Sequence, residues 1–211
     1  MGLMSIGKEI NWIFFDVGST LVDETKAYEH RILDAIEGTD VTVEQFMEKR
    51  LYFARQNLKG DLETVKYFGL KLTPWHSEDE IPYPDAEDIL IYIRDKGYKI
   101  GVIANQPHGT ADRLESYGFL QYVNVVAASA ELGVAKPDKE IFNKAFEMAG
   151  CTAGECVMIG DRLDNDIIPA KELGMKTIWI RNGFAIHQIP RSPEETPDYT
   201  VDNLLELKKI L

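Results

Sequence analysis

Short apolar runs that each lead to a polar residue recur along this chain, and a helical pattern follows all but the last of them. Continuous apolar runs of this length are typical of parallel strands, because such strands are buried on both faces. The runs span residues 10–15, 99–104, 123–128, 155–159 and 176–180. Strands that alternate with helices predict an α/β fold, in which a Rossmann-like doubly wound parallel sheet carries helices on both faces.

The helical patterns predict where the helices of this repeating part begin and end. They cover residues 85–96, 110–117, 138–149, 165–173 and 202–210. A glycine directly follows four helical stretches, at Gly97, Gly118, Gly150 and Gly174. Glycine at this position ends a helix without steric strain, so the glycines support the predicted boundaries.

The alternation of strands and helices stops between residues 21 and 82. Three helical patterns follow one another there, over residues 26–37, 43–58 and 62–68, with no strand pattern between them. An insertion directly after the first strand stands over the carboxyl ends of the strands, where open α/β sheets bind their ligands. We therefore predict a core domain of residues 1–20 and 83–211 and a small inserted α-helical cap, residues 21–82, that acts as a lid.

The composition argues against several classes of partner. The net charge is −12, whereas proteins that bind nucleic acid need clustered cations for the phosphate backbone. No stretch approaches about eighteen apolar residues and the N-terminus lacks an apolar signal segment, so no contact with a membrane is expected. Cys151 and Cys156 fit neither a redox pair nor a zinc spacing. We therefore expect a cytoplasmic protein with two ordinary thiols, and the sequence leaves its oligomeric state open.

Three charged residues should be brought together by the predicted fold. Asp16 follows the first strand, Asp161 follows the strand over residues 155–159, and Lys136 lies in a loop between strands. Because the carboxyl ends of parallel strands meet at one edge of a sheet, these side chains should converge. Two carboxylates brought together repel, so the arrangement needs a cation, and oxygen ligands suit Mg²⁺. Lys136 would then stabilise the carboxylates or a transferring phosphoryl group.

Three segments resemble the motifs of one known family. Residues 15–23 (FDVGSTLVD) look like the first motif of the haloacid dehalogenase superfamily, and residues 135–138 (AKPD) are similar to its third. Residues 159–166 (IGDRLDND) resemble its fourth motif, so the resemblance spans nearly the whole chain. It implies a hydrolase with a Rossmann-like core and a small helical cap between the first and second motifs.

The resemblance also implies a role for individual residues. Asp16 would be the nucleophile that forms an aspartyl-phosphate with a small phosphorylated metabolite, and Lys136 would hold the nucleophile and the phosphate. Mg²⁺ would be bound by Asp16, by Asp161 and by the backbone carbonyl of Gly18. The residues that would support these groups from behind are Thr20 and Asp166.

Two positions depart from the family's pattern. The residue two after the nucleophile is normally an aspartate that protonates the leaving alcohol and later activates water, and here it is Gly18. The second motif normally ends in Ser or Thr, which binds the phosphoryl group, and here it ends in Ala104. Phosphate would then be bound by Lys136, by the backbone at Ala104, and by Asn105 or Gln106. Removing a general acid loses about 10²–10⁴ in rate and removing one such donor about 10²–10³, so turnover should be slow rather than absent.

Three functions fit these observations. The first is a slow or specialised Mg²⁺-dependent phosphatase. The second is a catalytically impaired relative that acts as a phosphate- and metal-binding regulatory module. The third is a haloacid dehalogenase or a phosphonate hydrolase, since relatives with those activities also lack the second aspartate. The third is the weakest, because the serine that such dehalogenases carry beside Asn105 is absent and no lysine of the insertion stands out for an imine.

Other residues near the motifs have a structural interpretation first. His108 is expected at the surface or at a helix start, and Trp12 in or beside the first strand. Trp75 lies near the end of the insertion, where it packs at the hinge or contacts ligand. Asp23 and Glu24 closely follow the nucleophile, so a carboxylate there could partly replace the absent one, although a role in starting the next helix is favoured.

Overall fold

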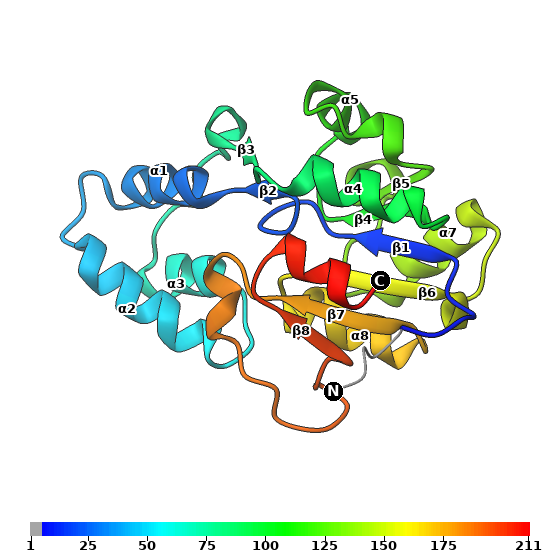
Figure 1. Ribbon diagram of the computed structural model, residues 1–211. Coiled ribbons are helices and arrows are strands. Elements are labelled where there is room, and N and C mark those ends of the chain that lie inside the picture. The colour runs from blue at the N-terminus through cyan, green and yellow to red at the C-terminus, as the bar shows by residue number, and fades with distance from the viewer. Residues whose placement is uncertain (1–5) are drawn as a thin grey trace.

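Six parallel strands form one sheet in the computed structural model, which describes residues 6–211 (Figure 1). The strands are β1 (Trp12–Phe15), β4 (Lys99–Ala104), β5 (Val125–Ala128), β6 (Cys156–Gly160), β7 (Lys176–Ile180) and β8 (Tyr199–Val201). They lie in the order β5-β4-β1-β6-β7-β8, so the predicted Rossmann-like α/β fold is confirmed. The sequence did not indicate β8, because a three-residue edge strand with a single buried residue carries almost no apolar pattern.

Helices connect the strands and cover both faces of the sheet (Figure 1). They are α4 (Ala86–Asp95), α5 (Thr110–Ser116), α6 (Ser129–Leu132), α7 (Lys139–Ala149) and α8 (Ile168–Glu172). The buried side of α4 belongs to the hydrophobic core on one face of the sheet, and that of α7 to the core on the other. Asp138 begins α7 by accepting a hydrogen bond from the Glu140 N–H at 2.9 Å.

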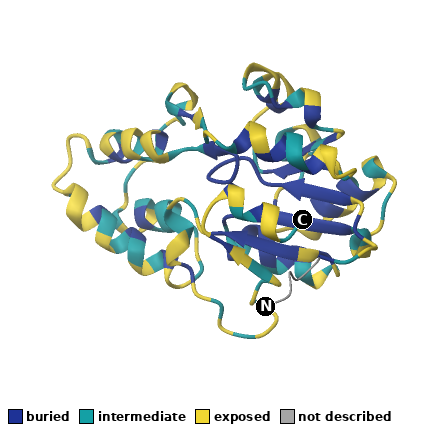
Figure 2. Ribbon diagram, in the orientation of Figure 1, coloured by how far each residue is buried: buried dark blue, intermediate teal, exposed yellow. Residues whose placement is uncertain are grey.

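Strand β1 is buried on both faces, as its apolar run predicts. Ile13 and Phe15 belong to the core that contains α4, whereas Trp12 and Phe14 belong to the core that contains α7. Gly101 of β4 makes room for Phe14, because a Cβ atom there would lie 2.2 Å from the Phe14 ring. Alternate side chains of one strand thus fasten both helical layers, and Figure 2 shows the strands as the buried centre of the molecule.

The helix predicted over residues 165–173 differs in type from the observed one. It begins as a π-helical turn, Leu163–Ile167, and continues as the short helix α8. Pro169 lies in the first turn of α8, where its missing N–H breaks no helical hydrogen bond. The π-helical turn carries Asp164, Asn165 and Asp166 of the motif at residues 159–166. The change in helix type therefore changes the directions in which these polar side chains point.

The predicted helix over residues 202–210 also differs in type. The structure has a 3₁₀ helix, Leu204–Lys209, in which Leu204 and Leu207 are both buried. Residues three apart lie directly above one another in a 3₁₀ helix. Both leucines therefore point into the core beside α4, whereas an α-helix would place residues three apart at different angles around its axis.

Three α-helices between residues 24 and 80 form a separate group at one end of the sheet (Figure 1). They are α1 (Thr25–Ile36), α2 (Val43–Ala54) and α3 (Gly60–Phe68), and we call residues 24–80 the helical insertion. The chain enters and leaves the helical insertion through β2 (Val22–Asp23) and β3 (Ile81–Pro82), which pair antiparallel. Two-residue strands carry no periodicity, which is why the sequence pattern did not indicate this pair.

The connection between α2 and α3 is hydrogen-bonded to the segment of residues 189–191, which lies outside the helical insertion. Asn57 has a left-handed backbone conformation, with φ of 57°, so α2 ends before the predicted boundary at residue 58. The Asn57 side-chain amide donates to the Ile189 carbonyl and accepts from the Ile189 N–H, each at 2.9 Å. Arg191 donates to the Arg55 carbonyl at 3.0 Å. These bonds attach the helical insertion to the core at a second place, away from β2 and β3.

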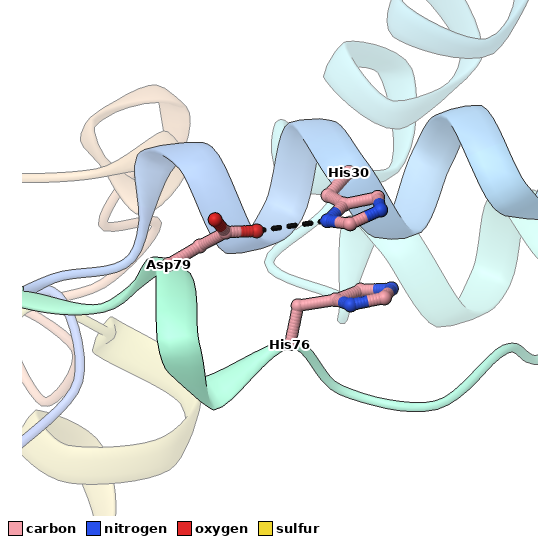
Figure 3. Close-up of side chains that lie close together, drawn as sticks. All are labelled: His30, His76 and Asp79. Carbon is pink, nitrogen blue, oxygen red and sulfur yellow. Dashed lines mark hydrogen bonds and ion pairs between the residues drawn. The ribbon is translucent and has the colours of Figure 1, made fainter.

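A cluster of histidines and carboxylates joins α1 to the segment before β3 (Figure 3). The rings of His30 and His76 stack with centroids 3.5 Å apart and an angle of 11° between planes. His30 Nδ1 lies 2.9 Å from Asp79, and the two nitrogens of His76 lie 2.7 Å from Asp34 and 3.1 Å from Glu78. These hydrogen bonds raise the pKa of His76 above its ordinary value. Because the rings are parallel and both His76 nitrogens face carboxylates, their lone pairs do not converge on one metal ion, and the cluster braces the helical insertion.

The described helices are all short, and the two cysteines form no disulfide with each other. Among residues 6–211, no helix combines the length and apolar character needed to cross a bilayer. Cys151 and Cys156 are free thiols, and burial raises the pKa of each.

Candidate functional site

Asp16 and Asp161 lie side by side at the carboxyl edge of the sheet. Asp16 directly follows β1 and Asp161 directly follows β6, and these two strands pair in parallel. The Asp16 N–H donates to the Ile159 carbonyl at 2.9 Å, which continues the ladder into the turn. Asp166 reaches the same place from the π-helical turn, and one carboxylate oxygen of each of the three aspartates lies within 4.8 Å of the others. The structure thus brings Asp16 and Asp161 together, as the predicted parallel strands imply, and adds Asp166.

Lys136 supplies a positive charge to this cluster. Its Nζ lies 2.7 Å from Asp16 Oδ1 and 2.6 Å from Asp166 Oδ1, and its side chain is fully buried. Burial alone would lower the pKa of Lys136, but the two carboxylates outweigh it, so the pKa is raised and the amine stays protonated. The Asn105 side chain holds the Lys136 backbone from the other side, because it donates to the carbonyl at 2.8 Å and accepts from the N–H at 2.7 Å.

Asp166 is fixed by close packing as well as by Lys136. Its Oδ2 accepts a hydrogen bond from the Arg162 N–H at 3.0 Å. A Cβ atom on Gly160 would lie 2.5 Å from the Asp166 side chain, so only glycine allows this approach. Burial raises the pKa of Asp166 to about 6, although the charge of Lys136 acts against this rise. Asp166 therefore orients the lysine from a buried position.

The carboxylate of Asp161 has no hydrogen bond or ion pair within the described residues. Burial, and next the charges of Asp166 and Asp16, raise the pKa of Asp161 well above its usual range. Three carboxylates here face one ammonium group, so two negative charges remain uncompensated when all are ionised. A divalent cation would balance this excess, and an all-oxygen set of donors is the set that Mg²⁺ prefers. The residues present therefore fit the metal that the sequence implied.

The turn after Asp16 has a strained backbone. Ser19 has φ of 54°, in the left-handed region that residues other than glycine rarely adopt. Gly183, which follows β7, packs against this turn, because a Cβ atom there would lie 2.8 Å from Ser19 Oγ. Thr20 is fully buried, and its hydroxyl has no hydrogen-bond partner among residues 6–211. The turn of residues 17–20 is thus packed between the ends of β1 and β7, and this packing fixes its backbone.

Glu24 directs its carboxyl group toward this turn. Its Oε2 accepts a hydrogen bond from Ser19 Oγ at 3.2 Å, and a Cβ atom on Gly18 would lie 2.2 Å from its Oε1. Asp23 has the expected role in starting α1, since its side chain accepts from the Thr25 N–H at 2.8 Å. Glu24 makes no such bond although it is the residue at the helix start. Burial, followed by nearby carboxylates, raises the pKa of Glu24 to about 8.

A cavity of about 420 Å³ lies over the aspartates, between the sheet edge and the helical insertion. Asp16 and Asp161 line it from the core, and Arg31 and Lys59 line it from the insertion. Its volume falls within the range of small-molecule sites. Burial lowers the pKa of Lys59. Arg31 carried no motif or spacing by which the sequence could have indicated it, because only the placement of the helical insertion beside the sheet edge brings it to the cavity.

The residues expected to bind phosphate occupy different positions around this cavity. Asn105 and Gln106 line it, whereas Ala104 is fully buried at the end of β4. The Gln106 N–H donates to Ser129 Oγ at 3.1 Å, and its side chain accepts from Arg113. Gln106 therefore has protein partners for its main-chain donor and its side-chain oxygen.

Two tryptophans and a histidine complete the residues singled out in the sequence. His108 is exposed in a loop. Trp12 is buried in β1 and stacks on Phe14 with ring centroids 5.5 Å apart. Trp75 both lines the cavity and donates to Glu80 at 2.6 Å, so it packs at the end of the insertion and faces ligand space.

Known proteins resemble this chain in sequence and in structure. Glyceraldehyde 3-phosphate phosphatase from Pyrococcus abyssi is 33% identical over 199 residues, which covers 82% of each protein. The enzyme of that name from Pyrococcus furiosus is 29% identical over 97% of this chain and 94% of its own. The one from Methanopyrus kandleri is 35% identical over 134 residues, and the chain spans 56% of its length. A solved haloacid dehalogenase phosphatase from Thermococcus onnurineus superposes with a TM-score of 0.63 at 28% identity, over 95% of this chain and 97% of that one.

The family model of the haloacid dehalogenase-like hydrolases matches residues 10–174, which is most of the chain. This span contains four of the six strands of the parallel sheet, β1, β4, β5 and β6, and the aspartates that follow two of them. The chain therefore belongs to the haloacid dehalogenase-like hydrolases, as its motifs implied.

Proposed function

We propose that this chain is an Mg²⁺-dependent phosphatase that acts on a small phosphorylated metabolite through an aspartyl-phosphate at Asp16. One observation carries the proposal: Asp16 lines a cavity of metabolite size, Lys136 binds one of its oxygens, and Asp161, whose carboxylate has no partner among the described residues, lies beside it. The relatives named glyceraldehyde 3-phosphate phosphatase support a substrate of this class.

Lys136 positions one carboxylate oxygen of Asp16, and the other oxygen has no hydrogen-bond partner among residues 6–211. Lys136 Nζ binds Oδ1 at 2.7 Å, which leaves Oδ2 to attack phosphorus. In the first step the bond between Oδ2 and phosphorus forms, the bond to the alcohol oxygen breaks, and that oxygen takes a proton. In the second step water attacks phosphorus and gives up a proton, and the Asp16 carboxylate leaves. The covalent intermediate lowers the overall barrier, because it divides one difficult displacement into two easier ones.

Asp16, Asp161 and the backbone carbonyl of Gly18 would hold Mg²⁺. When bound, the ion supplies the positive charge that lets an anionic nucleophile approach an anionic phosphoryl group. Lys136 contributes a second positive charge at a fixed place, and Asp166 together with the buried Thr20 supports the turn and the lysine from behind. Phosphate would be bound by Lys136, Asn105, Gln106 and the backbone at Ala104.

The helical insertion would act as a cap over the reacting groups. It covers residues 24–80 within the predicted span 21–82, and it lines the cavity with Tyr28, Arg31 and Lys59. A closed cap excludes bulk water from the phosphoryl group during transfer. The two cations of the cap suit a substrate that carries negative charge beyond the reacting phosphorus.

A phosphatase screen tests this proposal. The chain is incubated with a panel of phosphorylated metabolites, with MgCl₂ or with EDTA, and released phosphate is measured for the wild type and for Asp16→Asn. The matched control is Asp112→Asn, which makes the same change at an exposed aspartate of α5. We expect Mg²⁺-dependent turnover in the wild type and in the control, and none in Asp16→Asn.

The other functions have outcomes of their own in this screen. If no substrate turns over while Mg²⁺ and inorganic phosphate still bind, the chain is a binding module. Release of halide from a 2-haloacid would favour a dehalogenase. Turnover that survives Asp16→Asn unchanged would refute the aspartyl-phosphate.

A further inference from the structure

The first chemical step needs a proton donor for the leaving alcohol, and Gly18 cannot supply one. When the bond between phosphorus and the alcohol oxygen breaks, that oxygen becomes an alkoxide unless a nearby group gives it a proton. Gly18 has no side chain, and Lys136 is fully buried with both its carboxylate partners in contact. The donor must therefore be another group that lines the cavity beside Asp16.

Glu24 fills the space that a side chain at position 18 would occupy. A Cβ atom built on Gly18 would lie 2.2 and 2.6 Å from the two carboxyl oxygens of Glu24. By standard bond lengths, the carboxyl oxygens of an aspartate lie about 2.4 Å from their own Cβ. The carboxyl carbon of Glu24 would lie 2.5 Å from the same point, farther than the carboxyl carbon of an aspartate lies from its own Cβ. The Glu24 carboxyl group therefore occupies the space of a side chain at position 18, although it enters that space from another direction.

The surroundings of Glu24 hold its carboxyl group toward the cavity. Ser19 Oγ donates to Oε2 at 3.2 Å, and Ser19 itself is fixed by its left-handed backbone and by Gly183. Glu24 lines the cavity together with Asp16. It pairs with no cation within 4.0 Å among residues 6–211 and makes no capping bond to α1, so neither stability role accounts for its half-buried position.

We propose that Glu24 is the general acid and base of this enzyme, and that it takes the place of the side chain missing at Gly18. This inference rests on the proposed phosphatase function. In the first step the Glu24 carboxyl gives its proton to the alcohol oxygen as the phosphorus–oxygen bond breaks, and Glu24 becomes a carboxylate. In the second step that carboxylate takes a proton from the attacking water as the bond from water oxygen to phosphorus forms and Asp16 leaves. Proton and charge are thereby restored after each turnover.

The leaving group provides a test that a structural role would not pass. A nitrophenolate leaves without a proton, whereas the alkoxide of glycerol phosphate needs one. Glu24→Gln keeps the size of the side chain and removes its acid–base chemistry. With glycerol phosphate we expect its kcat to fall by about 10²–10⁴. With p-nitrophenyl phosphate we expect a burst of about one nitrophenolate per active site followed by slow turnover, since only the second step is impaired, with phosphate trapped on Asp16.

A pair of variants tests the position itself. Gly18→Asp alone should fail, because its side chain would overlap the Glu24 carboxyl, and Glu24→Ala alone should lose the acid. The double variant Gly18→Asp with Glu24→Ala restores a carboxyl group in the freed space. We expect its kcat on glycerol phosphate to be at least tenfold higher than that of Glu24→Ala. Thermal unfolding of each variant identifies those that do not fold.

The outcomes separate this inference from the function on which it rests. The role of Glu24 is refuted if Glu24→Gln retains wild-type kcat on glycerol phosphate, or if both substrates lose the same factor with no burst. Failure of the double variant to exceed Glu24→Ala while it remains folded also refutes it. If Asp16→Asn hydrolyses both substrates, the proposed function itself is wrong, whatever the Glu24 variants do.

Discussion

Replacing Asp161 by asparagine should stabilise the metal-free protein while it removes the response to Mg²⁺. The Asp161 carboxylate lies within 4.8 Å of two other carboxylates and has no partner of its own among the described residues. At an effective dielectric constant of about 20, two like charges at this distance repel by about 3.5 kcal/mol. Asp161 faces two such charges and the opposite charge of Lys136, so the net repulsion is about that of one pair. Partial protonation relieves some of it, and we expect a gain of about 2 kcal/mol.

Thermal unfolding in EDTA and in MgCl₂ measures both effects. For a chain of this size about 2 kcal/mol raises Tm by about 4–8 °C, so Asp161→Asn should melt higher than wild type in EDTA. Mg²⁺ at about one hundred times its Kd should stabilise the wild type by about 2.7 kcal/mol and leave the variant nearly unchanged. Asp112→Asn, at an exposed aspartate, should follow the wild type in both conditions. A Tm of Asp161→Asn below that of wild type in EDTA, or an equal gain in Tm from Mg²⁺, would contradict both the repulsion at Asp161 and its role as a metal ligand.

Three further predictions follow from contacts around the site and in the helical insertion. Asn105→Ala removes both hydrogen bonds to the Lys136 backbone, and we expect about 1–3 kcal/mol less stability by denaturant unfolding together with lower kcat; unchanged values of both would contradict the positioning role. Gly160→Ala places a methyl group 2.5 Å from a buried side chain, so overpacking of about 1–3 kcal/mol should appear as a lower Tm. The raised pKa of His76 means that its stabilisation is complete below its ordinary value of 6.5 and is lost as pH rises through the raised value. The Tm advantage of wild type over His76→Gln should therefore shrink above pH 6.5, and a constant advantage would argue against this reading.

The strand ends of the core could be predicted from sequence because their signal is local. An apolar run that stops at Asp16 and another that leads to Asp161 indicate two buried strands, and parallel pairing then places both carboxylates at one edge. Lys136 lies 120 residues after Asp16, but it stands in a motif, so its approach to Asp16 could be inferred from family resemblance.

The sequence raised Asp23 or Glu24 as a replacement for the missing carboxylate, but it favoured a helix start for both and could not separate them. Only the three-dimensional turn reveals that Asp23 starts the helix while Glu24 faces the site. That turn depends on the left-handed backbone of Ser19, which is not the usual conformation of a serine. Asn105 is a similar case, because the sequence marks it as a polar residue near phosphate and does not show that its amide binds the Lys136 backbone.

The attachment of Asn57 to Ile189 bears on how quickly product can escape. Any movement of the α2–α3 end away from the sheet must break both hydrogen bonds between Asn57 and Ile189, each 2.9 Å long, and the hydrogen bond from Arg191 to the Arg55 carbonyl. At about 0.5–1.5 kcal/mol each, three bonds add about 1.5–4.5 kcal/mol to the opened state. If the helical insertion is the proposed cap, these hydrogen bonds, far from the reacting atoms, would slow its opening and with it the release of product.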